Sequence, residues 1–237
     1  WRDGIGPVEK RPRKRDLAWK SIETNEVGLD EFMKWADAAE VAPIYAVNLG
    51  TKGIEEALAV LEYCNMETGT YYSDLRAANG HEKPYGIRTW CLGNEMDGDW
   101  QIGHKTAEEY GRIAYETGKA MKILDPSIEL VACGSSMSTN STFGDWEQTV
   151  LEHCYPCLDY ISLHQYYGGQ EKGTAEFLAQ SLDMERYIET VLNICDYVRV
   201  KKKMSHKINI CFDEWGVWSM SDVQVQKSVE DAPWQTA

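Results

Sequence analysis

The chain has 237 residues, and 38 acidic against 24 basic side chains give it a formal charge of −14 with histidine neutral. This charge excludes a nucleic-acid binder that relies on phosphate contacts, and the apolar runs are too short to cross a membrane. With 43% hydrophobic and 26% charged residues, the composition is that of a globular protein with a substantial core.

Short segments rich in apolar or β-branched residues predict five strands, at 43–49, 87–92, 128–133, 158–163 and 208–212. Three of these segments are almost continuously apolar, which is typical of parallel strands covered on both faces. Apolar stripes at helical spacing predict helices at 30–39, 54–66, 106–124 and 175–200. The third of these helices begins with a capping box, formed by Thr106 and Glu109.

The alternation of strands and helices leaves two architectures, an open doubly wound sheet or a closed eight-stranded barrel. The glycine-rich phosphate loop of a nucleotide-binding sheet is absent, whereas polar and aromatic residues follow every strand, as in a barrel. A full barrel uses about 250 residues for eight strands, but five strands here take almost the whole length. We therefore expect residues 1–237 to form one α/β domain, an incomplete (β/α)8 TIM barrel.

Seven cysteines are scattered along the chain, an odd number that does not suggest a disulfide framework. We therefore expect a reducing compartment and a cytoplasmic location. Cys154 and Cys157 have the C-x-x-C spacing of half a zinc site, but no second pair or histidine cluster is placed to complete four ligands. The sequence thus predicts neither a metal nor an organic cofactor.

Two carboxylates directly follow apolar strands, Glu95 in the segment LGNEMDG (92–98) and Glu214 in FDEWGVW (212–218). Hydrolysis of a glycosidic bond with retention needs two carboxyl groups about 5 to 5.5 Å apart, one protonated and one ionised. The rim of a parallel barrel can supply both. A single glutamate at a strand end is more often a solvated loop residue or the partner of a lysine or arginine. A pair, one preceded by asparagine and one followed by tryptophan, favours the catalytic interpretation.

The segments WCLGNEMDG (90–98) and DEWGVW (213–218) together closely resemble glycoside hydrolase family 51, the α-L-arabinofuranosidases. Four further segments are similar to parts of that family in the same order, WRDGIGP (1–7), LAW (17–19), AVNLG (46–50) and HQYY (164–167). In this family a (β/α)8 barrel is joined to a β-sandwich. The resemblance implies that the five strands are barrel strands three to seven, and that the first two strands, the eighth and the C-terminal β-sandwich are missing.

The resemblance also assigns the residues that would carry out the reaction. Glu95 would be the acid/base and Glu214 the nucleophile, while Asn94 would bind the sugar 2-hydroxyl. Because an acid must begin protonated, we expect the pKa of Glu95 to be raised by the field of Glu214 and by partial burial.

Four other residues would support these three. Tyr166 would orient the nucleophile and keep it ionised, since a hydrogen bond to the charged form lowers a carboxylate pKa. Trp19 and Trp218 would form walls of the sugar subsite and of the neighbouring acceptor region. His164 is either a hydrogen-bond partner behind the catalytic residues or simply a satisfied histidine at the barrel mouth.

By resemblance, the sequence predicts a retaining hydrolase that releases terminal α-L-arabinofuranosyl residues from oligosaccharides or polysaccharides by double displacement. Two alternatives stay open: another retaining barrel glycosidase, such as an endoglucanase, a xylanase or a β-galactosidase-like enzyme, and a non-catalytic carbohydrate-binding fragment. The expected partners are an arabinofuranosyl substrate and, at full length, further copies of the protein, but no nucleic acid or membrane. Because an opened barrel exposes two strand edges, we expect this chain alone to be poorly active and marginally folded.

Overall fold

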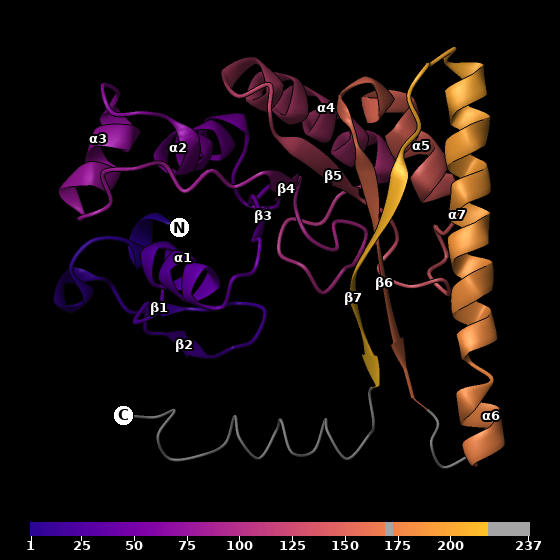
Figure 1. The fold of residues 1–237 in the computed structure, drawn as a ribbon. Coiled ribbons are helices and arrows are strands. Elements are labelled where there is room, and N and C mark those ends of the chain that lie inside the picture. The colour runs from indigo at the N-terminus through magenta and orange to yellow at the C-terminus, as the bar shows by residue number, and fades with distance from the viewer. Residues whose placement is uncertain (169–172, 218–237) are drawn as a thin grey trace.

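A parallel five-stranded sheet forms the centre of the computed structural model, which describes residues 1–168 and 173–217 (Figure 1). The strands are β3 (Ile44–Ala46), β4 (Thr89–Cys91), β5 (Glu129–Cys133), β6 (Tyr160–Tyr167) and β7 (Asn209–Val217). They pair in chain order, β3-β4-β5-β6-β7, as in a βα-barrel, and the sheet curls into a half-barrel. The five predicted strands and the predicted fold class are therefore confirmed.

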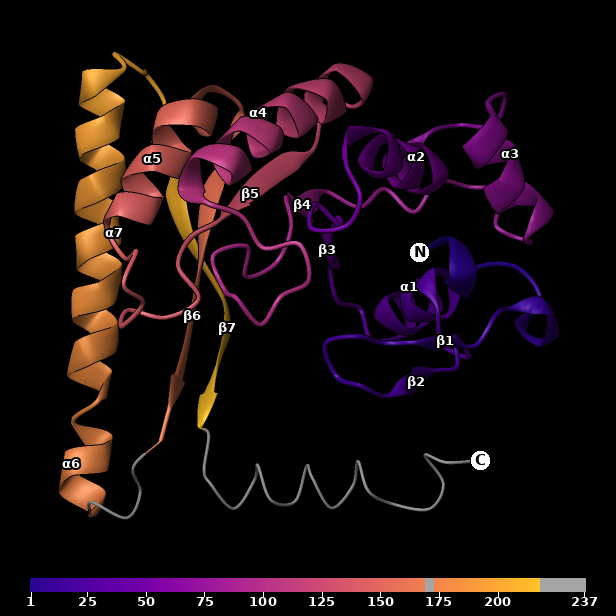
Figure 2. The ribbon, with the colours of Figure 1, turned by 180° about the vertical axis from the view of Figure 1, so that it is seen from behind.

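Helices separate the strands and cover the outer face of the sheet (Figure 2). The α-helices are α1 (Leu29–Ala38), α2 (Ile54–Asn65), α3 (Tyr71–Ala78), α4 (Ala107–Leu124), α5 (Asp145–Cys154), α6 (Thr174–Leu178) and α7 (Ser181–Lys201). Three short 3-10 helices are η1 (Arg2–Gly4), η2 (Val8–Lys10) and η3 (Tyr155–Cys157). Within the described residues, none of these helices has both the length and the apolar character needed to span a membrane.

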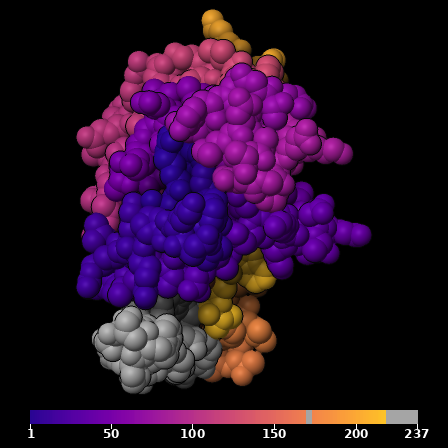
Figure 3. All heavy atoms as spheres, turned by 90° about the vertical axis from the view of Figure 1, so that its left-hand side faces the viewer, coloured from indigo at the N-terminus to yellow at the C-terminus, as the bar shows by residue number. Residues whose placement is uncertain are grey.

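The N-terminal segment adds a small antiparallel hairpin of β1 (Lys14–Arg15) and β2 (Ile22–Glu23), which was not predicted. The segment packs with α1 to α3 on the β3 side of the molecule, where the indigo and purple atoms gather in Figure 3. Arg11 connects its parts, because its guanidinium is bound to Glu31 of α1 at 2.8 Å and to the Gly6 carbonyl. The β1–β2 turn itself lies beside the carboxyl ends of β3 and β4, and it lines one cleft with the loops after these strands.

Two predictions for the helices need correction. The helix expected over 175–200 is two helices, because the chain turns at Ala179 and Gln180 between α6 and α7. None of the residues of α6 is fully buried. Helix α5 was missed, although Trp146, Val150 and Cys154 share one buried face at helical spacing.

Aromatic side chains fix the carboxyl ends of β4 and β5 against the helices. Tyr110 of α4 and Trp146 of α5 are buried and stacked, with ring centroids 5.4 Å apart. The Tyr110 hydroxyl donates to the Leu92 carbonyl at 2.7 Å and accepts from the Cys133 amide, while the Trp146 indole donates to the Cys133 carbonyl. The chain therefore leaves β4 from a rigid position.

The seven cysteines are free thiols. The Cys154 thiol donates to the Val150 carbonyl at 2.9 Å, and the Cys157 thiol donates to the Cys154 carbonyl at 3.3 Å. Burial raises the pKa of both thiols. These two groups thus bond separately to backbone carbonyls, as structural cysteines do.

Candidate active site

The loop after β4 presents Glu95 through two unusual backbone conformations. Gly93 has φ +101° and Glu95 itself has φ +45°, a left-handed conformation that costs energy for a residue with a side chain. Two residues farther on, Asp97 accepts hydrogen bonds from the backbone and hydroxyl of Ser136 and from the Asn140 amide at 2.5 Å. These bonds to the β5–α5 connection hold the loop in this conformation.

Glu214 owes its orientation to an irregularity in the pairing of β6 with β7. Leu163 is opposite Phe212, but the next residue, His164, is opposite Glu214, so Asp213 is an extra residue in β7. Successive side chains of a regular strand point to opposite faces, whereas a bulge changes the face of every later residue. As a result, Asp213 and Glu214 both contact His164.

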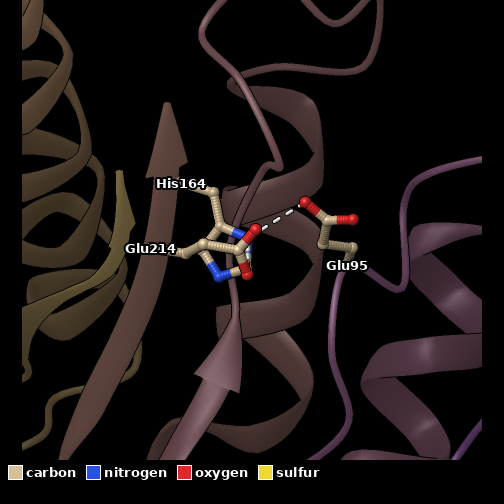
Figure 4. Close-up of side chains that lie close together, drawn as sticks. All are labelled: Glu95, His164 and Glu214. Carbon is tan, nitrogen blue, oxygen red and sulfur yellow. Dashed lines mark hydrogen bonds and ion pairs between the residues drawn. The ribbon is translucent and has the colours of Figure 1, made fainter. Parts of the chain in front are cut away.

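The imidazole of His164 joins the two predicted catalytic carboxylates (Figure 4). Its Nδ1 lies 3.1 Å from Glu95 Oε1 and 3.5 Å from Glu214 Oε2. One oxygen of each glutamate and one nitrogen of the histidine all lie within 4.8 Å of one another. The two carboxylates therefore face one space, and the approach of their oxygens is closer than the roughly 6.5 to 9.5 Å between the carboxyl groups of an inverting pair.

The charges in this cluster change the proton affinities of its members. Burial lowers the pKa of His164, but contacts with Asp213 and Glu95 and the charge of Glu214 outweigh burial and raise that pKa to about 9. The imidazole is therefore protonated at neutral pH. Because this side chain is 4% exposed and has three carboxylates as neighbours, His164 is part of the cluster and not a simple packing residue.

The pKa of Glu95 differs from the expectation. Burial raises it, but hydrogen bonds from His164, Trp100 and Gln101 outweigh burial, and the pKa is lower than that of an ordinary glutamate. The prediction of a raised pKa considered Glu214 and burial but not an adjacent imidazolium. A cation within hydrogen-bond distance stabilises the ionised form, so the prediction was wrong in sign.

Tyr166 lies beside Glu214, as predicted. Its hydroxyl donates to Glu214 Oε1 at 2.9 Å. Burial and then the hydrogen bond to this carboxylate raise the pKa of Tyr166 to about 12, so the phenol keeps the proton that it donates. One oxygen of Glu214 is thereby oriented by β6, and the other faces His164.

A cleft of about 420 Å³ opens next to the cluster, between the β1–β2 turn and the loops after β3 and β4. Asn94 is exposed and lines this cleft with Asn48 and Gln101. Trp19 follows the lining residue Ala18 in the turn and is 60% exposed. The structure brings neither Asn94 nor Trp19 into contact with the two carboxylates, and Trp218 lies outside the described residues.

Three residues that contact the cluster were not predicted. Trp100 donates its indole N–H to Glu95 Oε2 at 2.6 Å, and Gln101 donates to the same oxygen at 3.2 Å. Asp213 Oδ1 lies 3.4 Å from His164 Nε2. Trp100 and Gln101 lie five and six residues after Glu95, and this proximity along the chain is the only signal the sequence offers for them. In a regular strand, Asp213 and Glu214 would point to opposite faces, so only the bulge brings both to His164.

Glu95, His164 and Glu214 are also the one group of potential metal ligands that residues 1–168 and 173–217 bring together. An imidazole protonated on both nitrogens has no lone pair for a cation. In the charge state described above, the group is therefore suited to proton transfer and nucleophilic attack. It contains an imidazolium donor, a carboxylate that can accept its proton, and a second carboxylate oriented by a phenol.

Comparison with known proteins identifies close relatives. The family profile described as "Alpha-L-arabinofuranosidase 1 domain" matches residues 1–177. The intracellular exo-α-(1→5)-L-arabinofuranosidase 1 of Bacillus subtilis is 57% identical over 237 residues, which are 100% of this chain and 47% of that protein. The intracellular exo-α-(1→5)-L-arabinofuranosidase of Acetivibrio thermocellus is 54% identical with the same coverage.

Solved structures agree with these matches. A family 51 α-L-arabinofuranosidase from Bifidobacterium longum superposes with a TM-score of 0.91 at 45% identity, over 100% of this chain and 47% of that one. An arabinose complex of the α-L-arabinofuranosidase from Thermotoga maritima superposes with a TM-score of 0.84 at 39% identity, over 92% and 43%. The chain thus spans about half the length of the relatives that it matches.

Proposed function

Because the chain belongs to the α-L-arabinofuranosidases of glycoside hydrolase family 51, we propose that it carries the catalytic pair of a retaining, exo-acting arabinofuranosidase. The substrate would be a terminal α-L-arabinofuranosyl residue of an oligosaccharide or polysaccharide. The observation that carries the proposal is the approach of Glu95 and Glu214 across His164, with oxygens within 4.8 Å at the carboxyl ends of two parallel strands. That separation admits a sugar ring but not an additional attacking water.

In the first step, Glu214 attacks the anomeric carbon while Glu95 gives a proton to the departing oxygen. The bond from the anomeric carbon to the leaving group breaks as the bond to Glu214 forms. Tyr166 holds one Glu214 oxygen by the 2.9 Å hydrogen bond, which leaves the other oxygen to attack. The left-handed Glu95 backbone and the Asp97 anchor support the acid in place.

In the second step, Glu95 is ionised and removes a proton from water, which attacks the same carbon from the face that the leaving group vacated. Two inversions leave the product with the starting configuration. Asn94 would bind the sugar 2-hydroxyl. Trp19 and Trp218 would line the sugar subsite and the neighbouring acceptor region. The cleft beside Asn94 offers space for these contacts.

Three broader features belong to the same proposal. Residues 1–237 would act as part of one catalytic barrel domain. The protein would work inside the cell, a proposal supported by its free thiols and by relatives that are named intracellular. At full length it would form a homo-oligomer.

The substrate class is tested with three aryl glycosides incubated with the 237-residue chain. We expect release of the aryl group from an α-L-arabinofuranoside, at a reduced rate because the chain is shorter than its relatives. No release is expected from a β-xyloside or a β-cellobioside. Faster cleavage of either β-glycoside would replace the proposed substrate class, and sugar binding without any cleavage would make the chain a binding fragment.

The role of Glu214 is tested by Glu214→Ala. Turnover should vanish and return when azide is added, with an arabinosyl azide of inverted configuration as the product, because the external anion attacks once. Tyr166→Phe is a matched partner, since it keeps the carboxylate and removes only the hydrogen bond, and it should lose far less activity. Undiminished turnover in Glu214→Ala would refute the assignment.

A further inference from the structure

The proposed reaction uses the carboxylates of Glu95 and Glu214. Asp213 is a third carboxylate of the cluster, and the reaction assigns it no role. It is the extra residue of the β7 bulge. Its Oδ1 accepts a hydrogen bond from the Ser162 hydroxyl at 2.8 Å and lies 3.4 Å from Nε2 of His164. Its Oδ2 lies 3.8 Å from the Cys91 thiol of β4. The side chain therefore points toward the interior of the half-barrel, behind the imidazole.

The two nitrogens of His164 have different partners. Nδ1 faces the catalytic pair, at 3.1 Å from Glu95 and 3.5 Å from Glu214, whereas Nε2 faces Asp213. An imidazole donates from both nitrogens only when it is protonated, and the tautomer of a neutral ring is set by the partner with the stronger hold. The contact from Nδ1 to Glu95 is the shorter one, so a proton exchanged between the two residues leaves from Nδ1. Once Glu95 has taken this proton and is neutral, the charge of Asp213 holds the remaining proton of the ring on Nε2.

Resting on the proposed function, we propose that Asp213 is a positioning residue that keeps His164 doubly protonated and directs its Nδ1–H to Glu95. His164 then stores the proton that Glu95 uses on the leaving group. The bulge is the structural basis, because it allows consecutive residues of β7 to supply the nucleophile and the carboxylate behind the imidazole.

The proton balance is complete at every step. In the resting state the proton is on His164 Nδ1 and Glu95 is ionised. As the glycosidic bond breaks, this proton passes to Glu95 Oε1 over the 3.1 Å contact, and the carboxyl group protonates the leaving oxygen. When water attacks the glycosyl enzyme, Glu95 takes a proton from it and returns one to His164. No other donor or acceptor is required.

The arrangement also explains how an acid can act although its pKa is lowered in the resting cluster. The pair of His164 and Glu95 titrates as a unit that holds one proton at neutral pH, whichever residue carries it. The charged groups that face His164 are Glu95 from the β4 loop and Asp213 and Glu214 from β7. When Glu214 loses its charge by forming the glycosyl bond, Asp213 remains as the fixed anion behind the ring.

The first test does not need turnover. Nitrogen-15 NMR of the histidine side chains in the 237-residue chain should show both ring nitrogens of His164 protonated at pH 7.5, with loss of the proton near pH 9. In Asp213→Asn, which keeps the shape and removes the charge, the midpoint should fall by about one pH unit or more. A ring with one bare nitrogen at pH 7.5 in the unmutated chain, or an unchanged midpoint in Asp213→Asn, would overturn the proposal.

Ser162→Ala is the matched control. It removes the other hydrogen bond to Asp213 Oδ1 and leaves the carboxylate next to His164. We expect its midpoint to move by less than about half a pH unit. An equal shift in both variants would mean that local packing, and not the charge of Asp213, sets the state of the imidazole.

The second test measures kcat/KM against pH on an aryl α-L-arabinofuranoside. In Asp213→Asn, the fall of kcat/KM at alkaline pH should begin about one pH unit lower, because His164 and Glu95 lose their shared proton at a lower pH. The KM of this variant should change less than about twofold. A uniformly lower profile with an unmoved alkaline fall would leave Asp213 a merely structural role. If no substrate is cleaved by any variant, the proposed function fails, but the NMR titration still decides the state of His164.

Discussion

Two glutamates with little exposed surface follow neighbouring strands of the sheet, yet their surroundings differ in one decisive respect. Glu147 of α5 is fully buried and accepts backbone hydrogen bonds from Ser135 at 2.7 Å and Gly144 at 2.8 Å. Burial raises its pKa, as expected for a carboxyl group removed from water. Glu95 is also mostly buried, but its partners are side chains, and one of them, His164, can exchange a proton with it.

The comparison shows that burial of a carboxylate does not by itself indicate chemistry. The donors to Glu147 are fixed amides that cannot change charge, so this residue caps α5 and fastens the β5–α5 connection. Glu95 instead shares a titratable partner with a second carboxylate and has a cleft beside it. A reactive carboxylate is therefore distinguished by a partner that titrates and by access to the substrate.

The largest expected difference between the two glutamates is in catalysis. Glu95→Gln should reduce kcat/KM by about 10²- to 10⁴-fold on substrates with poor leaving groups, the usual contribution of a general acid. The loss should be much smaller for an aryl arabinofuranoside whose phenol needs no proton. Steady-state kinetics on both substrates check this, and an equal loss on the two would contradict a role in protonating the leaving group.

The free energy of unfolding should depend on pH because the cluster stabilises the protonated form of His164. The folded pKa of His164, about 9, lies above its unfolded value, so its stabilisation is complete below pH ~6.5 and disappears as the pH rises through 9. Between about pH 6.5 and 8, below the range in which the free thiols of the unfolded chain ionise, the free energy of unfolding should fall by about 2 kcal/mol. Urea unfolding at a series of pH values measures it. In His164→Gln the dependence should flatten, and the same slope in both proteins would assign it elsewhere.

Substitution of the structural glutamate should affect stability and leave the catalytic pH profile in place. Glu147→Gln keeps the side-chain volume, but the new amide has only one oxygen to accept from the two backbone N–H groups of Ser135 and Gly144. One buried N–H therefore loses its acceptor, and the free energy of unfolding should fall by about 2 kcal/mol. Urea unfolding of this variant beside Glu95→Gln gives the direct comparison. If Glu147→Gln shifted the pH dependence of kcat/KM and left the free energy of unfolding unchanged, the roles assigned to the two residues would be reversed.

The smallest effect should come from Trp100→Phe. This change removes the indole N–H that Glu95 Oε2 accepts, so the pKa of Glu95 should rise toward its ordinary value. Carbon-13 NMR of labelled glutamate carboxyl groups would follow the shift. Trp35→Phe on the exposed face of α1 is the control and should leave the Glu95 signal unchanged.

Local sequence patterns were sufficient for much of the framework. The five strands follow from short apolar runs, and Thr106 caps α4 with the expected bond, in which its hydroxyl accepts from the Glu109 amide. Glu95 and Glu214 could be selected because each comes shortly after a short apolar run, and parallel strands bring their carboxyl ends to one rim. These properties depend on neighbours along the chain, so they are visible in the sequence.

Tertiary structure alone decided how the site is completed. The bulge that puts Asp213 and Glu214 against His164 depends on the register of β7 against β6, whereas period-two alternation predicts opposite faces. The pKa of Glu95 is lowered because Trp100, Gln101 and His164 donate to it, and which side chains turn toward it depends on the folded loop and on the distant strand β6. Residue types and spacing thus determined which groups were available, while strand register and long-range contacts determined their orientation and charge, because proton affinity depends on distances in space.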